Sequence, residues 1–246
     1  GGRFKTMFDG SEFRRMASVF SMFELNVHAP FYKKINDLLH LNTPEFYLDY
    51  LNDSTLNARM NHIGSIIDHP NDLISLAGFS MVEGVILYSN FAYLKHFSSQ
   101  GKNKIANITR GIDFSVRDEN IHSMAGAWCF KHKAKKLGIT TEGMETIYQT
   151  IKELAQQLLE HEIIIIRKVF EKGSIDGITD QQLISFVKHR IDLCLQNLGF
   201  KPIYHVTNDL ISSWFYNGIN SYQFSDFFVG VGREYNRNWD ATAFTW

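Results

Sequence analysis

The stretch from residue 72 to residue 97 is the longest apolar segment of the chain, and it constrains the fold more than any other. In a helix, its roughly 26 residues would extend about 39 Å. One acidic residue, Glu83, lies in the middle of this segment with no basic residue near it in sequence. A carboxylate in an apolar helix is costly to bury unless a partner compensates its charge. The segment therefore predicts a long core helix whose glutamate faces a metal ion or a partner from another helix.

The rest of the chain has the pattern of one helical domain. Glycine-free stretches are long and the chain has only four prolines, which favours long helices over many short strands. Ser11 and Thr179 are candidate helix caps, Pro30 should distort the helix that contains it, and Gly199 is a candidate helix end. We expect one all-α domain, loose over its first ten residues, with helices over residues 11–28, 57–68, 72–97, 103–137, 141–172 and 179–199.

Charge and cysteine content exclude several classes of protein. A net charge of −1 with 21% charged residues gives no electrostatic reason to expect nucleic acid or an anionic membrane as a partner. Cys129 and Cys194 lie far apart in sequence, which favours free thiols in a reducing, intracellular setting. There is no signal-peptide pattern, and the longest purely apolar run, Ile163–Ile166, is too short to span a bilayer. We therefore expect a cytoplasmic protein with no nucleic-acid or membrane partner.

A run of polar residues, Arg117–His122, carries the clearest chemical signal. Its Glu119 and His122 are three residues apart, so they share one face of a helix. An earlier helix carries a second glutamate–histidine pair, four residues apart. Such pairs, together with further buried glutamates, are typical of ferritin-like di-metal sites, and their carboxylate-rich composition suits iron or manganese better than zinc. The sequence thus predicts a ferritin-like helical bundle with a di-metal carboxylate site in its core, with the candidate ligands Glu24, His28, Glu83, Glu119 and His122.

These motifs resemble those of the small, radical-generating subunit of class I ribonucleotide reductase, in a phage or viral form. Arg117–His122 resembles the family's Arg-Asp-Glu-x-x-His motif, and Glu83–Val85 resembles its third ligand helix. His28–Tyr32 resembles the ligand histidine that is followed four residues later by the radical tyrosine. Phe227–Tyr235 resembles the segment that leads to the tail tyrosine of the radical relay. The resemblance covers roughly residues 16–237.

The resemblance implies a role for each matching residue. Glu83, Glu119, His122 and His28 would bind two metal ions, iron by default, with manganese or a mixed pair as alternatives. The radical would reside on Tyr32 or on the metals, and Asp118 would hydrogen-bond a ligand histidine on the electron path. Tyr235 would pass the oxidising equivalent to the large subunit, which reduces ribonucleotides to deoxyribonucleotides. Residues 1–237 would then form the helical domain and residues 238–246 a tail that docks on the large subunit. A homodimer in the cytoplasm, or in the host cytoplasm for a phage protein, is implied as well.

Two positions depart from the family pattern. The family has a glutamate three residues before the ligand histidine, where this chain has Leu25, while Glu24 lies one residue earlier. One residue turns a side chain by about 100° around an α-helix, so Glu24 reaches the site only if the backbone shifts, for instance through a π-bulge near Pro30. The family's first ligand, an aspartate further upstream, has no clear counterpart. Asp9 is the available acidic candidate, and its spacing differs.

Two other functions remain open at this point. One is a ferritin-like, metal-dependent two-electron oxidase in which Tyr32 is an ordinary core residue. The other is a helical scaffold subunit with a degenerate metal site. Tyr32 and Tyr235 favour the radical-generating subunit, whereas Leu25 favours these two alternatives.

Overall fold

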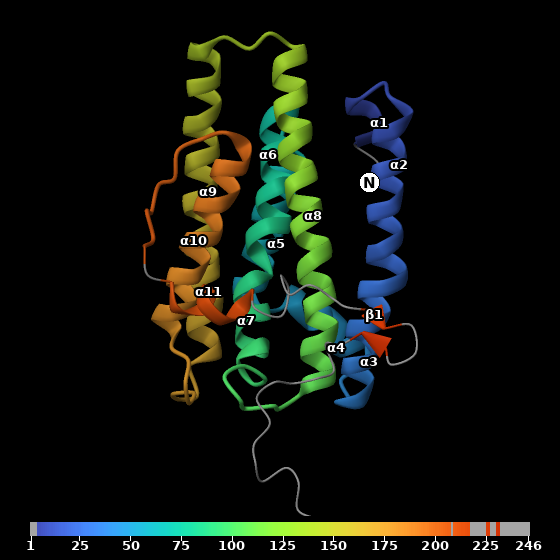
Figure 1. Ribbon diagram of the computed structural model, residues 1–246, viewed down its shortest axis with the longest axis vertical. Helices are drawn as coiled ribbons and strands as arrows, with labels where there is room; N and C mark the ends of the chain where they lie inside the picture. Colours follow the sequence, from blue (N-terminus) through green and yellow to red (C-terminus); the bar gives the residue numbers. More distant parts are fainter. Residues whose placement is uncertain (1–3, 208, 217–224, 227–229, 232–246) are drawn as a thin grey trace, which may run out of the picture.

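The fold is a bundle of long helices that run side by side along the longest axis of the molecule (Figure 1). It is given by a computed structural model that describes residues 4–207, 209–216, 225–226 and 230–231. Two π-helical turns, η1 (Glu24–His28) and η3 (Val82–Ile86), and a 3-10 turn, η2 (Asp49–Leu51), lie between helices. The helices are α1 (Phe4–Met7), α2 (Ser11–Phe23), α3 (Ala29–Leu38), α4 (Pro44–Leu48), α5 (Ser54–Ile67), α6 (Asp72–Met81), α7 (Tyr88–His96), α8 (Ala106–Lys136), α9 (Thr141–Val169), α10 (Asp180–Leu198) and α11 (Leu210–Phe215). A short antiparallel pair, β1 (Ser225–Asp226) and β2 (Gly230–Val231), follows them. The predicted all-α architecture is confirmed.

The centre of the bundle is formed by the long apolar segment of residues 72–97. It forms α6, η3 and α7 in succession, rather than the single uninterrupted helix predicted over residues 72–97. α8, α9 and α10 pack around it, and α5 packs against α6 and α9. Val85, Tyr88 and Ala92 in this segment are fully buried. Asp72–His96 is long and apolar enough by composition to cross a membrane, but 72% of its most apolar window is buried inside the bundle, as in a core helix.

The helix ends show where local sequence signals decide the structure. Thr179 caps α10 in a reciprocal capping box with Gln182, and Gly199 ends this helix with a φ of 95°, as predicted. The prediction that Ser11 caps α2 is wrong. Ser11 is the first residue of that helix, and the N-cap position is occupied by Gly10, which has no side chain to form a capping hydrogen bond.

The amino-terminal segment is less loose than expected. Residues Phe4–Met7 form α1. The ring of Phe8 is buried and stacks on that of Phe13, with the ring centroids 4.2 Å apart. Aromatic burial therefore ties part of the first ten residues to α2.

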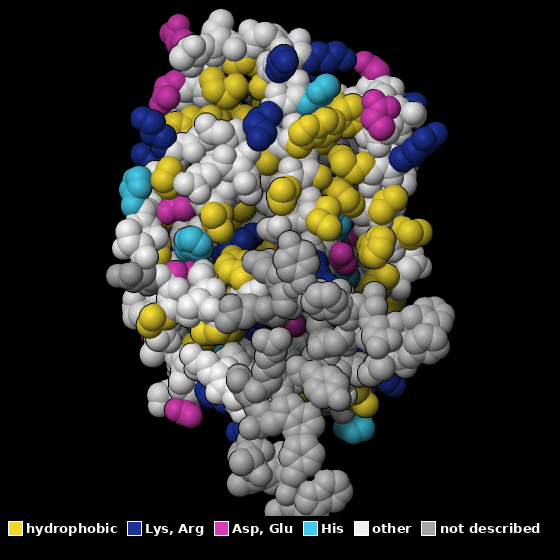
Figure 2. Space-filling model, in the orientation of Figure 1, with side chains coloured by type: hydrophobic (Ala, Val, Ile, Leu, Met, Phe, Trp, Pro, Cys, Tyr) yellow, Lys and Arg dark blue, Asp and Glu magenta, His cyan; other side chains and the backbone are white. Residues whose placement is uncertain are grey.

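One face of the bundle exposes several large hydrophobic side chains. Figure 2 shows hydrophobic side chains gathered over the region of α2 and α8. The large hydrophobic residues exposed on α2, on the adjoining η1 and on α8 include Met22, Leu25, Ile121, Met124 and Trp128. An exposed apolar surface of this kind is a candidate for contact with another protein segment.

Gly84, within η3, allows close packing at the centre of the bundle. A Cβ atom at this position would lie 2.4 Å from Cys194 Sγ on α10 and 2.5 Å from Ser123 Oγ on α8. Both cysteines of the chain, Cys129 and Cys194, are buried and free, so this packing involves a thiol rather than a disulfide. The missing side chain lets the segment that carries Glu83 approach both neighbouring helices.

We expect Gly84→Ala to destabilise the fold by about 1–3 kcal/mol, because the added methyl group overpacks the core. Urea unfolding followed by circular dichroism measures this change. The matched control is Gly64→Ala in α5, where a Cβ meets nothing within 4 Å. That variant should gain about 0.5–1 kcal/mol from helix propensity. Equal effects of the two substitutions would contradict the close approach at Gly84.

Candidate metal centre

The candidate centre lies where η1, η3 and α8 meet, and it begins with an irregularity in the first of these elements. Pro30 has no amide hydrogen, so it cannot donate to the carbonyl of Asn26, as an α-helix requires. The backbone forms the π-helical turn η1, which ends at His28, two residues before Pro30. This is the type of shift that Glu24 needs in order to reach the site.

Glu24 and His28 face each other within η1. Glu24 Oε1 lies 3.0 Å from His28 Nδ1, and the same oxygen lies 3.7 Å from His122 Nδ1 on α8. Leu25, where the family pattern has its glutamate, is 71% exposed. The π turn therefore brings Glu24 to the site and leaves Leu25 outside it.

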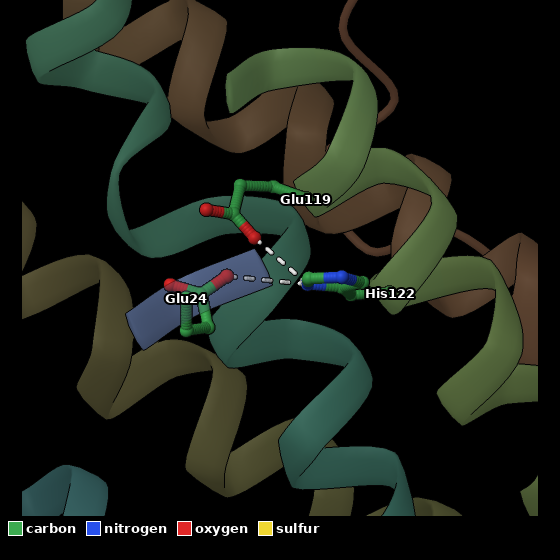
Figure 3. A group of neighbouring side chains, drawn as sticks. All are labelled: Glu24, Glu119 and His122. Atoms are coloured by element: carbon green, nitrogen blue, oxygen red, sulfur yellow. Dashed lines mark hydrogen bonds and ion pairs between the residues drawn. The ribbon is translucent and has the colours of Figure 1, made fainter. Parts of the chain in front are cut away.

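α8 contributes the central carboxylate. Glu119 and His122 are each 3% exposed, and Glu119 Oε2 lies 3.0 Å from His122 Nδ1. The other oxygen, Oε1, lies 3.2 Å from His28 Nδ1. Figure 3 shows the carboxylates of Glu24 and Glu119 directed at the ring of His122. Ligand atoms of these three residues all lie within 4.8 Å of one another, a spacing that suits a shared cation.

Glu83 closes the cluster from η3. Its Oε2 lies 3.5 Å from His122 Nδ1, and its side chain is 21% exposed. The structure thus brings together all five predicted ligand residues, from three segments that are distant in the sequence.

The charges in the cluster are mutually dependent. The carboxylates of Glu119 and Glu24, which lie close to Nδ1, raise the pKa of His28 to about 10. Burial lowers the pKa of His122, but Glu119 and Glu83 outweigh it and raise this pKa to about 9. Burial also raises the pKa of Glu83, whereas His122 and His28 overcome burial at Glu119 and hold its pKa below the usual range. The carboxylates therefore favour positive charge at both ring positions, and metal ions supply such charge.

Asp118 holds the far side of one imidazole. Its Oδ2 lies 3.0 Å from His28 Nε2, which leaves Nδ1 directed toward Glu24 and Glu119. A carboxylate on the second nitrogen of a histidine fixes the ring orientation and increases the basicity of the other nitrogen. The hydrogen bond expected between Asp118 and a candidate ligand histidine is therefore present.

Tyr32 lies one turn beyond His28, half-buried, with its hydroxyl donating to Ser115 Oγ at 3.2 Å. Burial raises the pKa of Tyr32 to about 12, so the phenol stays protonated near neutral pH. Sequence reasoning missed Ser115. Its position four residues before Glu119 on the same helix face was the available signal.

Other sequence predictions fall outside the cluster or outside the described residues. Asp9 is not part of the centre: it is 98% exposed and pairs with Lys136, 3.2 Å away. Lys136 lies fourteen residues beyond His122 on α8, roughly 21 Å along the helix. Tyr235 and the tail 238–246 lie outside the described residues.

Two buried polar atoms in the cluster indicate that it fits metal ions. Glu24 Oε1 and His28 Nδ1 are shielded from solvent, yet neither has a hydrogen-bond partner of good geometry. Unsatisfied buried polar atoms are rare and need an explanation, such as an ion. Both atoms face the same space as the Glu119 carboxylate. The donor set of carboxylates and two imidazoles fits iron or manganese.

The sequence of this chain matches one protein family over most of its length. The family described as ribonucleotide reductase, small chain, matches residues 2–209. The chain belongs to this family. The ribonucleoside-diphosphate reductase subunit beta of Chlamydia pneumoniae is 30% identical over 139 residues, which are 54% of this chain and 38% of that protein. The chain thus spans well under half of the length of this curated relative.

Solved structures share the fold of this small chain. A protein from Bacillus halodurans assigned to class I ribonucleotide reductase superposes with a TM-score of 0.70 at 21% identity, covering 83% of this chain and 74% of that one. The dimanganese(II)-NrdF of Streptococcus sanguinis gives 0.67 at 22% identity, covering 80% and 68%. The ferritin-like bundle predicted from the sequence is confirmed. The phage or viral origin stays a prediction.

The placement of Glu24 yields a direct prediction for this small chain. The double substitution Glu24→Leu with Leu25→Glu moves the carboxylate to the position of the family pattern. We expect at least about a tenfold loss of Mn(II) affinity, because position 25 faces outward. Equilibrium dialysis with metal analysis measures it. Leu25→Glu alone should bind as wild type does. A double variant with wild-type affinity would show that η1 can rearrange into a regular α-helix.

Proposed function

We propose that this chain is the radical-generating small subunit of a class I ribonucleoside-diphosphate reductase. The observation that carries the proposal is a single cluster beside a hydrogen-bonded tyrosine. Its members are Glu24, His28, Glu83, Glu119 and His122. Family membership supports the same activity. The large subunit, as partner, would use the radical to reduce ribonucleotides to deoxyribonucleotides.

The five clustered residues are proposed to hold two metal ions. Glu119 would contribute to holding the ions at both histidines, since its two oxygens face different imidazoles. Iron is the proposed metal, with manganese or a mixed pair as alternatives, and the dimanganese relative supports keeping manganese in the test. When bound, the ions supply the electrons that reduce dioxygen and the oxidising power that a radical-generating subunit needs.

The remaining roles follow from the hydrogen bonds around the cluster. Asp118 keeps His28 Nδ1 directed at the metal position. Tyr32 is protonated near neutral pH, so its oxidation must release a proton together with an electron. Ser115 Oγ already accepts the hydrogen bond from that phenol. We therefore propose that the radical resides on Tyr32, with the metals as the alternative site.

Transfer to the large subunit is proposed to use the carboxyl-terminal segment. Tyr235 would pass on the oxidising equivalent, and residues 238–246 would dock on the partner. A second copy of the chain is proposed to complete a homodimer, and the exposed apolar side chains on α2 and α8 supply surface for such a contact. We place the assembly in the cytoplasm, or in the host cytoplasm for a phage protein.

The test combines metal analysis with electron paramagnetic resonance. The protein is loaded with Fe(II) or Mn(II), exposed to oxygen and examined for a tyrosyl signal, and turnover is then measured with the large subunit. Two ions per chain and a tyrosyl signal are expected. Bound metal with neither a radical signal nor turnover would favour the two-electron oxidase. Absence of bound metal would leave the scaffold function.

A further inference from the structure

We propose that Arg190 and Arg59 are positioning residues that set the place of Glu83 in the metal centre. Both act through the backbone of η3 and neither touches the proposed metal position. This inference rests on the proposed function, because it takes Glu83 as a metal ligand.

Arg190 comes from α10 and is 4% exposed. Its Nε donates to the backbone carbonyl of Gly84 at 2.9 Å. Its Nη1 donates to the hydroxyl of Tyr216 at 2.8 Å, and its guanidinium lies over the ring of Tyr88 at 3.8 Å from the centroid. The guanidinium is thus held on two further sides, so it presents Nε to Gly84 in one orientation.

Arg59 comes from α5 and is 9% exposed. Its Nη2 donates to the backbone carbonyl of Ile86, the last residue of η3, at 3.1 Å. Its Nε lies 3.3 Å from Glu162 Oε1 on α9, and Ser89 donates to the other oxygen of Glu162 at 2.8 Å. This second guanidinium is therefore also fixed by partners outside η3.

The two arginines hold η3 from different directions. Gly84 and Ile86 are two residues apart, so their carbonyls belong to roughly opposite sides of the helix. Glu83 lies next to the first of these residues and extends toward His122. A π turn is less regular than an α-helix and needs surrounding structure to keep it in place. Hydrogen bonds from a charged guanidinium to a buried carbonyl are stronger than those between neutral groups, so they can hold the π turn in place.

Among the described residues, the other π turn, η1, has a different kind of support. Near η1, the side-chain amide of Asn26 donates to the carbonyl of Met22 at 3.0 Å, within the same helical segment. That support is exposed, local and followed by Pro30. η3 has no proline beside it, and its carbonyl partners come from α5 and α10. The position of Glu83 therefore depends on two distant helices.

The experiment measures Mn(II) binding by the electron paramagnetic resonance signal of the free ion. Arg190→Lys keeps the charge but lacks the planar fork that contacts Gly84 and Tyr216 together, and Arg190→Met removes both. We expect each to weaken Mn(II) binding by about tenfold, the scale for losing an outer partner of a metal ligand. Arg59→Lys should act in the same direction.

The matched control is Lys133→Met. Lys133 is also a largely buried cation that donates to a backbone carbonyl, that of Met7 at 3.0 Å, and pairs with Asp72. Its described partners lie outside η3, so we expect Mn(II) affinity within about twofold of wild type. Thermal unfolding by circular dichroism shows whether the control and the arginine variants are similarly destabilised.

A double-mutant cycle separates positioning from a general structural role. In a Glu83→Gln background, Arg190→Lys should change Mn(II) affinity by less than about twofold, because the carboxylate that it positions is already gone. An unchanged tenfold effect in that background, or an equal loss in Lys133→Met, would overturn the inference.

The remaining outcomes distinguish a failure of the positioning role of the arginines from a failure of the proposed metal centre. If Arg190→Met fails to fold, the two lysine variants carry the test. Wild-type protein that binds Mn(II), together with lysine variants that bind it equally well, would overturn the positioning role and leave the metal centre intact. Wild-type protein that binds no metal would overturn both.

Discussion

In the Glu119→Gln variant, metal binding is expected to weaken by more than about 100-fold, beyond the usual cost of losing an outer partner of a ligand. Glu119 is the carboxylate whose oxygens lie at 3.2 Å from His28 Nδ1 and 3.0 Å from His122 Nδ1. Glutamine keeps the shape but removes the charge and replaces one acceptor oxygen with a donor. The substitution would therefore remove the carboxylate partner of both histidines at once. Dialysis against Fe(II) or Mn(II) under anaerobic conditions, followed by metal analysis, measures the loss.

Asp113→Asn is the matched control for this substitution. Asp113 lies on the same helix and forms an ion pair with Lys95, so its replacement also removes a partly buried carboxylate. It should leave the number of bound ions unchanged. If Glu119→Gln retained two ions per chain, the cluster would not be the metal site.

In the Tyr32→Phe variant, two metal ions should still bind, while the tyrosyl signal and turnover with the large subunit fall to the background of the assays. The phenol is the group that loses a proton and an electron, and phenylalanine has neither an acidic proton nor a comparably oxidisable ring. The lost hydrogen bond to Ser115 should cost about 1 kcal/mol of stability, too little to unfold the bundle. Electron paramagnetic resonance and a deoxyribonucleotide assay check both parts.

Tyr148→Phe is the corresponding control, because its hydroxyl donates to the carbonyl of Lys201 at 3.3 Å and α9, which carries Tyr148, contributes none of the clustered residues. It should retain signal and turnover. A tyrosyl signal that survives in Tyr32→Phe would assign the radical to another tyrosine. Turnover without any tyrosyl signal would place the oxidising equivalent on the metals.

The long helices could be predicted because their signals are local. The expected helix over 103–137 corresponds to α8 (Ala106–Lys136), and the one over 179–199 corresponds to α10 (Asp180–Leu198). The π turn η3 could not be predicted in the same way. Its surroundings are set by Arg59, Arg190 and the close contacts of Gly84, all of which depend on tertiary packing.

In the candidate site, too, the residues with local sequence signals could be predicted, whereas those that depend on tertiary packing could not. Glu119 and His122 share a helix face by spacing alone, and Asp118 follows from its place in the motif. Glu24 required a backbone shift for which Pro30 supplied a local cause. The arginines behind Glu83 left no signal, since an isolated arginine in an amphipathic helix is normally a surface residue.

The π turn η1 also bears on how such chains are compared with one another. A π turn is equivalent to one residue inserted into an α-helix, so Glu24-x-x-x-His28 corresponds to a Glu-x-x-His pair that has gained a residue. An ungapped alignment matches Leu25 to the ligand glutamate and counts the site as incomplete, whereas a one-residue gap restores it. The same insertion turns α2 by about 100° relative to α3. Deleting Asn26 would regularise the spacing but rotate the outer surface of α2, so the irregular turn and the face presented by that helix are inherited together.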